Sequence, residues 1–93
     1  MGDEVMAIAV PAWPTGGAQA ERVVVPVDST ALIPDGIDVM KAATLPMNGL
    51  TAYRALDLLD LNRGDVLLVT GAAGTLGGYL IQLAALEGLE VVA

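Results

Sequence analysis

The residues with the clearest capacity for chemistry are glycines that crowd one short stretch of the second half of the chain. The stretch reads Gly71-Ala72-Ala73-Gly74-Thr75-Leu76-Gly77-Gly78. A glycine-rich turn between a strand and a helix lets the backbone approach a bound pyrophosphate. The N–H groups and the dipole at the start of the helix then attract the anion. The stretch therefore predicts a dinucleotide-binding loop.

The spacing of the loop follows the pattern G-x-G-x-x-G, with alanine at the first position. The three positions are Ala72, Gly74 and Gly77, and alanine is small enough for the turn if its φ angle stays negative. The backbone amides of Thr75 and Leu76 are the candidate donors to the pyrophosphate. No Lys-Ser or Lys-Thr pair follows the glycines, which argues against a nucleoside-triphosphate loop.

Two other interpretations of the same glycines stay open. The glycines could be close-packing residues of an ordinary α/β turn. Residues 66–86 also form 21 consecutive residues without a charge, long enough to span a membrane, and Gly74 and Gly78 match a helix-dimer spacing. Against a span, glycines weaken a helix and the flanking Asp65 and Glu87 supply no positive anchor.

The flanking sequence predicts the elements that position this loop. The continuous apolar run 66–70 is typical of a parallel strand covered on both faces. A helix over 76–87 follows, Gly88 suits the position just past its end, and another strand begins at residue 90. Together these elements form a βαβ unit. Four positions define the expected buried face of the helix: Leu76, Leu80, Leu83 and Leu86 or Glu87.

The first half of the chain has a different backbone, because all five prolines precede residue 47. Two strands joined by a loop suggest part of an antiparallel barrel or sheet, since two strands alone are marginal in water. Asp38 is a candidate N-cap for a short helix. In the longer helix that follows, the three- and four-residue spacing of one face selects Leu50, Tyr53, Leu56 (or Asp57) and Leu59 or Asp60, with Arg54, Asp57 and Asp60 on a wetter side. We expect strands at 4–10 and 21–27, joined by a loop at 11–19. A connector at 28–36 leads to a short helix at 39–44, and the longer helix at 46–60 ends in a turn at 61–65.

The amino-acid composition excludes several classes of function. The chain has no Cys and no His, so it offers neither disulfides nor the usual zinc ligands. Four Lys and Arg against 11 Asp and Glu give a net charge of −7, which argues against nucleic-acid binding. The start, Met1-Gly2-Asp3-Glu4, lacks the basic region of a signal peptide, so we expect a cytoplasmic protein that is not membrane-bound.

The chain resembles the medium-chain dehydrogenase/reductase superfamily, most closely its quinone oxidoreductase (zeta-crystallin-like) branch, and looks like an internal fragment of it. The matching segments appear in the family's order and cover nearly the whole chain. They are Gly2-Asp3-Glu4-Val5, Ala20-Glu21 with Val23-Val24-Val25-Pro26, Ala42-Ala43-Thr44-Leu45-Pro46 with Gly49-Leu50-Thr51-Ala52-Tyr53, and Gly71-Ala72-Ala73-Gly74-x-x-Gly77.

The resemblance implies an α/β fold in which the end of a GroES-like β domain is joined by helices to the first βαβ unit of an incomplete Rossmann domain. We expect these parts at 1–37, 38–65 and 66–93. Ala72, Gly74 and Gly77 would face the pyrophosphate. Thr51 and, with less support, Asn48 would lie near the cofactor. Alternatively, the Thr51 hydroxyl bonds its own helix backbone, and Asn48 is an ordinary helix-start residue.

The implied activity is hydride transfer between NAD(P)(H), with NADPH favoured, and a quinone, an enone or an enoyl thioester. The alternative is a non-catalytic remnant that associates through its apolar surface. No residue qualifies as a general acid or base, and the 93-residue chain alone is expected to be inactive and to form oligomers. The ribose-reading residue lies about 20 residues beyond such a loop, at or past residue 93, so the preference for NADPH comes from the resemblance alone.

Overall fold

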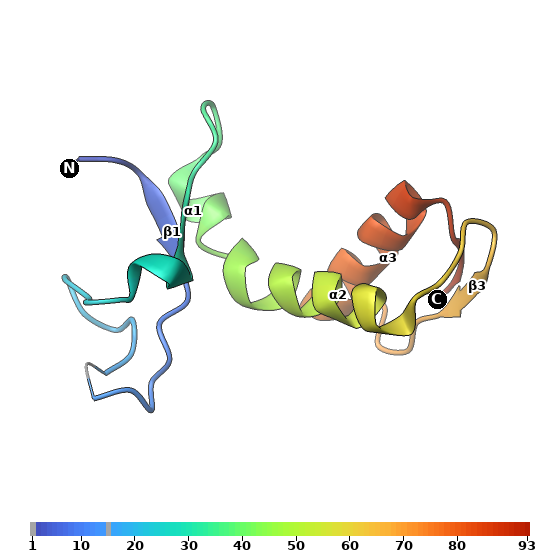
Figure 1. Cartoon of the computed structure of the whole chain (residues 1–93), viewed down its shortest axis with the longest axis horizontal. Helices are drawn as coiled ribbons and strands as arrows, with labels where there is room; N and C mark the ends of the chain where they lie inside the picture. The colour runs from blue at the N-terminus through green and yellow to red at the C-terminus, as the bar shows by residue number, and fades with distance from the viewer. Residues whose placement is uncertain (1, 15) are drawn as a thin grey trace. The chain divides into compact units, whose positions relative to one another are not determined.

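The computed structural model describes residues 2–14 and 16–93 (Figure 1). It divides at Pro46 into two units. The first unit is Met1–Pro46 and the second is Met47–Ala93. The break falls at the start of the predicted longer helix, so nearly all of that helix belongs to the second unit. The division into 1–37, 38–65 and 66–93 stays a prediction.

The first unit contains an antiparallel pair of short strands. Strand β1 (Val5–Ala7) pairs with β2 (Thr30–Leu32), with Met6 opposite Ala31. Backbone hydrogen bonds continue the pairing by one residue beyond each end of β1. The prediction of a strand within 4–10 is therefore confirmed over residues 5–7.

The predicted second strand, 21–27, is wrong. Its place is taken by β2, which lies in the region expected to be a connector. Pro26 has no N–H to offer a strand ladder, and its carbonyl instead accepts the Ser29 N–H at 2.9 Å, at a 3₁₀ turn (η1, Val27–Ser29). Val24 is 73% exposed, so this β-branched run gains little burial within the chain.

The short helix α1 (Val39–Ala42) begins where the sequence predicts. The Asp38 carboxylate accepts the Lys41 N–H at 3.0 Å, which satisfies one of the donors that the first helical turn leaves unpaired. Ala42, at the end of α1, is buried. The N-cap prediction is confirmed.

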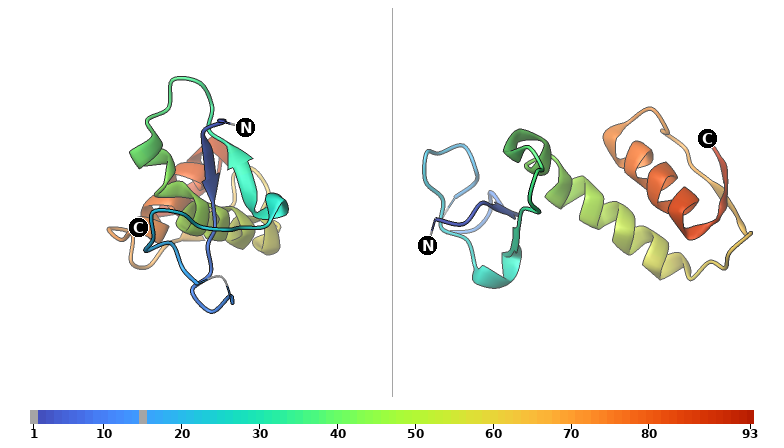
Figure 2. Two further views of the ribbon diagram at one scale, coloured as in Figure 1. Left: turned by 90° about the vertical axis from the view of Figure 1, so that its left-hand side faces the viewer. Right: turned by 90° about the horizontal axis from the view of Figure 1, so that it is seen from above.

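Helix α2 (Leu45–Leu59) buries a different face from the predicted one. Gly49, Ala52 and Leu56 are buried, whereas the other three predicted core residues, Leu50, Tyr53 and Leu59, are about half exposed or more. Leu56 packs against Ala84 of helix α3 (Thr75–Glu87), and Figure 2 shows the two helices side by side. Gly49 and Ala52 are small, so neighbouring groups can approach the backbone of α2 closely on that face. A prediction from the spacing of large apolar residues alone therefore selected the wrong face.

A parallel pair of strands closes the second unit. Strand β3 (Val66–Leu68) pairs with β4 (Glu90–Val92), and the Val69 N–H extends the pairing to the Val92 carbonyl at 2.8 Å. The parallel strand is confirmed. Coverage of both faces is not observed within this chain, because the side chains of Val66 and Leu68 are 61% and 68% exposed.

Helix α3 returns the chain from β3 to β4. Gly88 ends it with a left-handed φ of +81°, and the Leu89 N–H reaches back to the Ala84 carbonyl at 3.0 Å, which forms a Schellman motif. Leu80 and Leu83 pack on the core as predicted, whereas Leu86 is 82% exposed. One core cluster consists of Leu56, Ala84 and Leu89, with Leu61, Leu67, Leu80, Leu83 and Val91 packed against it.

The 21 uncharged residues at 66–86 do not form one helix. They divide into strand β3, the glycine-rich loop and most of α3. Over the described part of the chain, no helix is both long and apolar enough to cross a membrane.

Candidate cofactor loop

The glycine-rich loop leaves the end of β3 and enters α3 through a tight turn. Gly71 has a left-handed φ of +70°, and its carbonyl accepts the Gly74 N–H at 2.9 Å. Among the described residues, only Asp60 is a non-glycine with positive φ. The φ angle of Ala72 is therefore negative, as an alanine at the first motif position requires. The left-handed position of the turn is therefore Gly71, one residue before the first position of the motif.

Gly77 is buried where the first turn of α3 rests on this loop. A Cβ at Gly77 would overlap the Gly71 carbonyl oxygen and lie 2.8 Å from the Ala72 Cα. Both contacts are with backbone, which cannot rotate away as a flexible side chain can. The helix can approach the turn this closely only because position 77 has no side chain.

The N-terminus of α3 presents backbone donors. Gly74 is the N-cap and has no side chain to cap the helix, and the first recorded helical bond runs from the Gly78 N–H to the Gly74 carbonyl at 2.9 Å. The amides of Thr75, Leu76 and Gly77 precede that bond, in the turn whose N–H groups have no intrahelical acceptor. With the helix dipole, they provide the chemistry that binds an anion.

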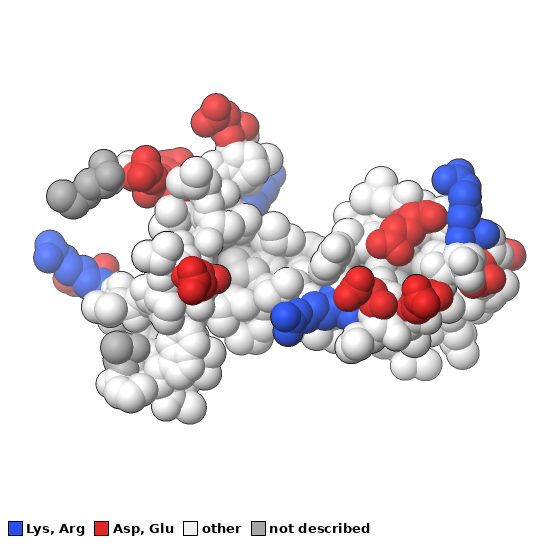
Figure 3. Space-filling view, viewed as in Figure 1, with Lys and Arg blue, Asp and Glu red and all other residues white. Residues whose placement is uncertain are grey.

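Basic side chains do not contribute to this segment. Residues 64–93 contain no Lys or Arg, and Figure 3 shows acidic side chains gathered on one face of the second unit. An anion at the loop would meet backbone N–H groups there, and no Lys or Arg side chain of residues 64–93.

The two remaining predicted residues lie on α2. Thr51 is exposed, and its hydroxyl donates to the Met47 carbonyl at 2.7 Å, which is the backbone bond foreseen as the alternative to a cofactor role. Asn48 is half-buried near the start of α2. No hydrogen bond among the described residues joins either side chain to the loop, so proximity of Thr51 and Asn48 to the cofactor stays a prediction.

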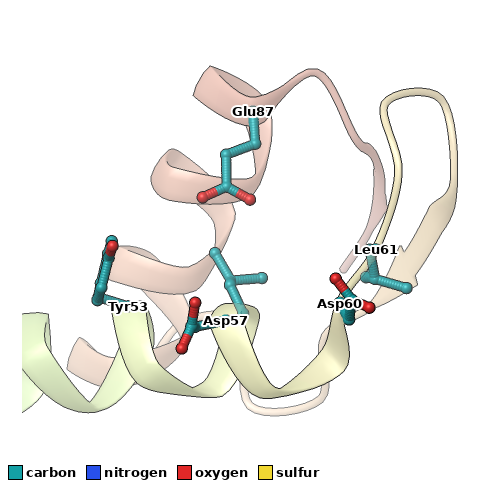
Figure 4. Close-up of a pocket in the computed structure, with 6 residues that line it drawn as sticks. Tyr53, Asp57, Asp60, Leu61 and Glu87 are labelled. Carbon is teal, nitrogen blue, oxygen red and sulfur yellow. The ribbon is translucent and has the colours of Figure 1, made fainter.

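A separate groove lies between the ends of α2 and α3. Apolar side chains form part of it, and Figure 4 shows the Glu87 carboxylate pointing from α3 toward α2. Across the described residues, no three acidic side chains are grouped so that they could hold a metal ion. The residues that line the groove are Tyr53, Leu56, Asp57, Asp60, Leu61 and Glu87.

Comparison with known proteins identifies the family, although no protein-family model matches the chain. The quinone oxidoreductase of Coxiella burnetii is 37% identical with a TM-score of 0.88, over 98% of this chain and 28% of that one. The quinone oxidoreductase of Thermus thermophilus, solved also with NADPH, is 41% identical with a TM-score of 0.76. The match covers 82% of this chain and 26% of that one. The chain belongs to the medium-chain dehydrogenase/reductase superfamily.

A further solved member of this superfamily is an enoyl reductase. The CurK enoyl reductase is 33% identical to the chain with a TM-score of 0.69, over 74% of this chain and 21% of that one. The curated relatives matched first are polyketide synthases, and the chain spans only 2–3% of their length. The fold is thus the α/β segment of the superfamily in which GroES-like and Rossmann domains meet.

Sequence reasoning missed Gly71. The motif spacing assigns the first position to Ala72, so Gly71 received no role of its own. The available signal was a glycine directly after an apolar strand, which marks a position where the chain needs a left-handed φ angle.

Proposed function

We propose that the protein carrying this sequence is an NADPH-dependent oxidoreductase that transfers hydride to a quinone, an enone or an enoyl thioester. The loop from β3 to α3 carries the proposal, because its backbone suits a pyrophosphate and its helix start presents N–H donors. The NADPH in the solved Thermus enzyme favours this cofactor. The three acceptors share a carbon–carbon double bond conjugated to a carbonyl group.

The residues of the loop fit a dinucleotide in a specific way. The absence of a side chain at Gly74 leaves the helix start open, and the close packing at Gly77 fixes the helix on the turn. The amides of Thr75 and Leu76 would donate to the pyrophosphate, with Ala72 beside it. The nicotinamide supplies the hydride when the cofactor is bound, and the protein orients it.

A substitution at the N-cap tests the cofactor assignment in the full-length protein. A Cβ at Gly74 would already lie 3.2 Å from the Gly71 carbonyl oxygen, so Gly74→Trp should crowd the turn and disturb the helix start whose amides would bind the pyrophosphate. We expect calorimetric titration to show a large loss of NADPH affinity. Leu58→Trp is the control, because Leu58 is 85% exposed on α2. Unchanged NADPH affinity in Gly74→Trp would refute the loop assignment.

The acceptor class needs its own assay. NADPH consumption by the full-length protein can be followed with a benzoquinone, an α,β-unsaturated ketone and a crotonyl thioester. We expect turnover with at least one of them. A protein that binds NADPH but reduces none of the three would contradict the proposed acceptors while leaving the cofactor assignment intact.

A second function is favoured by the open face of the parallel sheet. Val66, Leu68 and Val92 are each at least half exposed, so the 93-residue chain by itself would act as an associating, non-catalytic unit. Analytical ultracentrifugation should then show concentration-dependent oligomers that Leu68→Lys weakens and Leu58→Lys does not. A monomer at all concentrations would contradict this function.

A further inference from the structure

We propose that Asp35 is a site of spontaneous covalent modification, at which the peptide bond to Gly36 rearranges to an isoaspartyl bond. The other reactant is water. Asp35 and Gly36 form the middle of a turn before α1, and residues 34–37 are all exposed. The inference goes beyond the proposed function and does not depend on a bound cofactor.

The rearrangement consists of a ring closure and a hydrolysis. The Gly36 nitrogen forms a bond to the Asp35 Cγ, and the carboxylic OH leaves as water together with the N–H proton, which gives a cyclic imide. Water then adds to the main-chain carbonyl of Asp35 and breaks its bond to the Gly36 nitrogen. The main chain now runs through Cβ and Cγ. Nothing is oxidised or reduced, and the mass is unchanged.

The Gly36 nitrogen is accessible as the nucleophile. Gly36 has a left-handed φ of +80°, and no atom lies within 4 Å of the position that a Cβ would take. The hydrogen bond that closes the turn runs from the Ile37 N–H to the Pro34 carbonyl at 3.2 Å and does not involve the Gly36 N–H. Because surface loops move more than the elements that they connect, the Asp35 carboxyl group can reach this nitrogen.

The chain contains a second pair of this kind, Asn48-Gly49. By its chemistry alone this pair should react first, because an amide loses ammonia more readily than a carboxyl group loses water. However, Gly49 is buried and is the fifth residue of α2, so its N–H is the first in the helix to have an intrahelical acceptor. Ring closure at Asn48 would break that bond, and the helix therefore protects Asn48.

Asp28-Ser29 is a further pair with a small second residue. The Ser29 N–H donates to the Pro26 carbonyl at 2.9 Å at η1, so the nitrogen that would have to react is already engaged. Asp35-Gly36 differs from both other pairs because the hydrogen bond of its turn leaves that nitrogen out. The fold therefore selects the aspartate at position 35 over the asparagine at position 48.

The modification would alter the turn and leave the net charge as it is. An isoaspartyl bond adds a methylene group to the main chain between Pro34 and Ile37, which should break the hydrogen bond that joins them. The α-carboxylate that is released keeps the negative charge of the residue. The N-cap of α1 at Asp38 lies beyond the rearranged bond, and its carboxylate bonds within its own helix.

The experiment ages the purified full-length protein at physiological temperature and pH and maps its peptides by mass spectrometry. An isoaspartyl methyltransferase with a labelled methyl donor marks the rearranged residue. We expect label in the peptide that contains Asp35 and loss of that label in Asp35→Glu, because the larger ring that glutamate would form closes far more slowly. Asn48 should keep its amide group, and the peptide mass reports this because deamidation replaces NH₂ with OH.

Unfolding tests whether the fold sets this order. In guanidinium chloride, Asn48 should lose its amide group before Asp35 rearranges. A folded protein without label at Asp35, or one in which Asn48 deamidates first, would overturn the inference. Deamidation of Asn48 at the same rate with and without denaturant would also overturn it, because helix α2 would then give no protection.

Discussion

The side chain of Arg63 lies across Gly88, the residue at the C-terminus of α3. A Cβ at Gly88 would lie 3.0 Å from the Arg63 Cγ and 3.1 Å from its Cζ. The Gly88 carbonyl also accepts the Gly64 N–H at 3.0 Å. The turn before β3 is therefore joined to the end of α3 by a backbone bond and by a side chain packed on a glycine.

Gly88→Ala should lower the free energy of unfolding of the chain by about 1–2 kcal/mol, because alanine must adopt the left-handed φ of +81°. The crowding by Arg63 adds to this cost. Urea denaturation of the 93-residue chain, with wild type and variant at the same protein concentration, measures the change.

Arg63→Ala separates the two causes. In the Arg63→Ala background, Gly88→Ala should cost less, with a coupling of about 0.5–1 kcal/mol in a double-mutant cycle, because the neighbouring side chain is then absent. Strict additivity of the two substitutions would show that Arg63 does not restrict position 88.

Leu56→Ala should lower the free energy of unfolding by about 2–5 kcal/mol, the range for buried leucines. Leu56 is 4% exposed and packs with Ala84 and Leu89. Leu58→Ala is the matched control two residues along α2, where the side chain is 85% exposed, and it should change stability by less than about 0.5 kcal/mol. Similar costs at the two positions would mean that α2 buries another face.

Several elements were predictable from sequence because their signals are local. A continuous apolar run marks β3, Gly88 marks the end of α3, and Asp38 marks the start of α1. Each of these signals works through the residue's own backbone or a neighbour within one turn, so no knowledge of distant contacts is needed.

The failures came from contacts that sequence spacing does not encode. The buried face of α2 depends on small residues, Gly49 and Ala52, and not on the leucine spacing. The partner of β1 is β2, although the run 23–25 has the stronger β-branched signal. In the loop, the motif marked Ala72, whereas the left-handed φ lies at Gly71. All three features are set by non-local packing or by exact dihedral angles.

Asp38→Ala should destabilise the first unit by about 0.5–2 kcal/mol, the usual cost of losing an N-cap. The alanine side chain is a methyl group without a carboxylate, so the Lys41 N–H loses its acceptor. Asp38→Asn should retain most of the stability, since asparagine caps equally well. Urea denaturation followed by Trp13 fluorescence measures the effect, with Asp35→Ala, in the exposed turn before α1, as the control. An equal loss in Asp35→Ala would contradict a capping role for Asp38.

Gly77→Ala and Gly78→Ala should change stability in opposite directions. The Gly77 Cβ would meet the backbone of Gly71 and Ala72, and overpacking of this kind costs about 1–3 kcal/mol. The Gly78 Cβ would enter open space within the helix, where alanine is favoured over glycine by about 1 kcal/mol. In thermal unfolding, the midpoint temperature of Gly77→Ala should therefore lie below that of the wild type and the midpoint temperature of Gly78→Ala above it. A Gly77→Ala variant as stable as Gly78→Ala would show that α3 does not rest on the turn at Gly71.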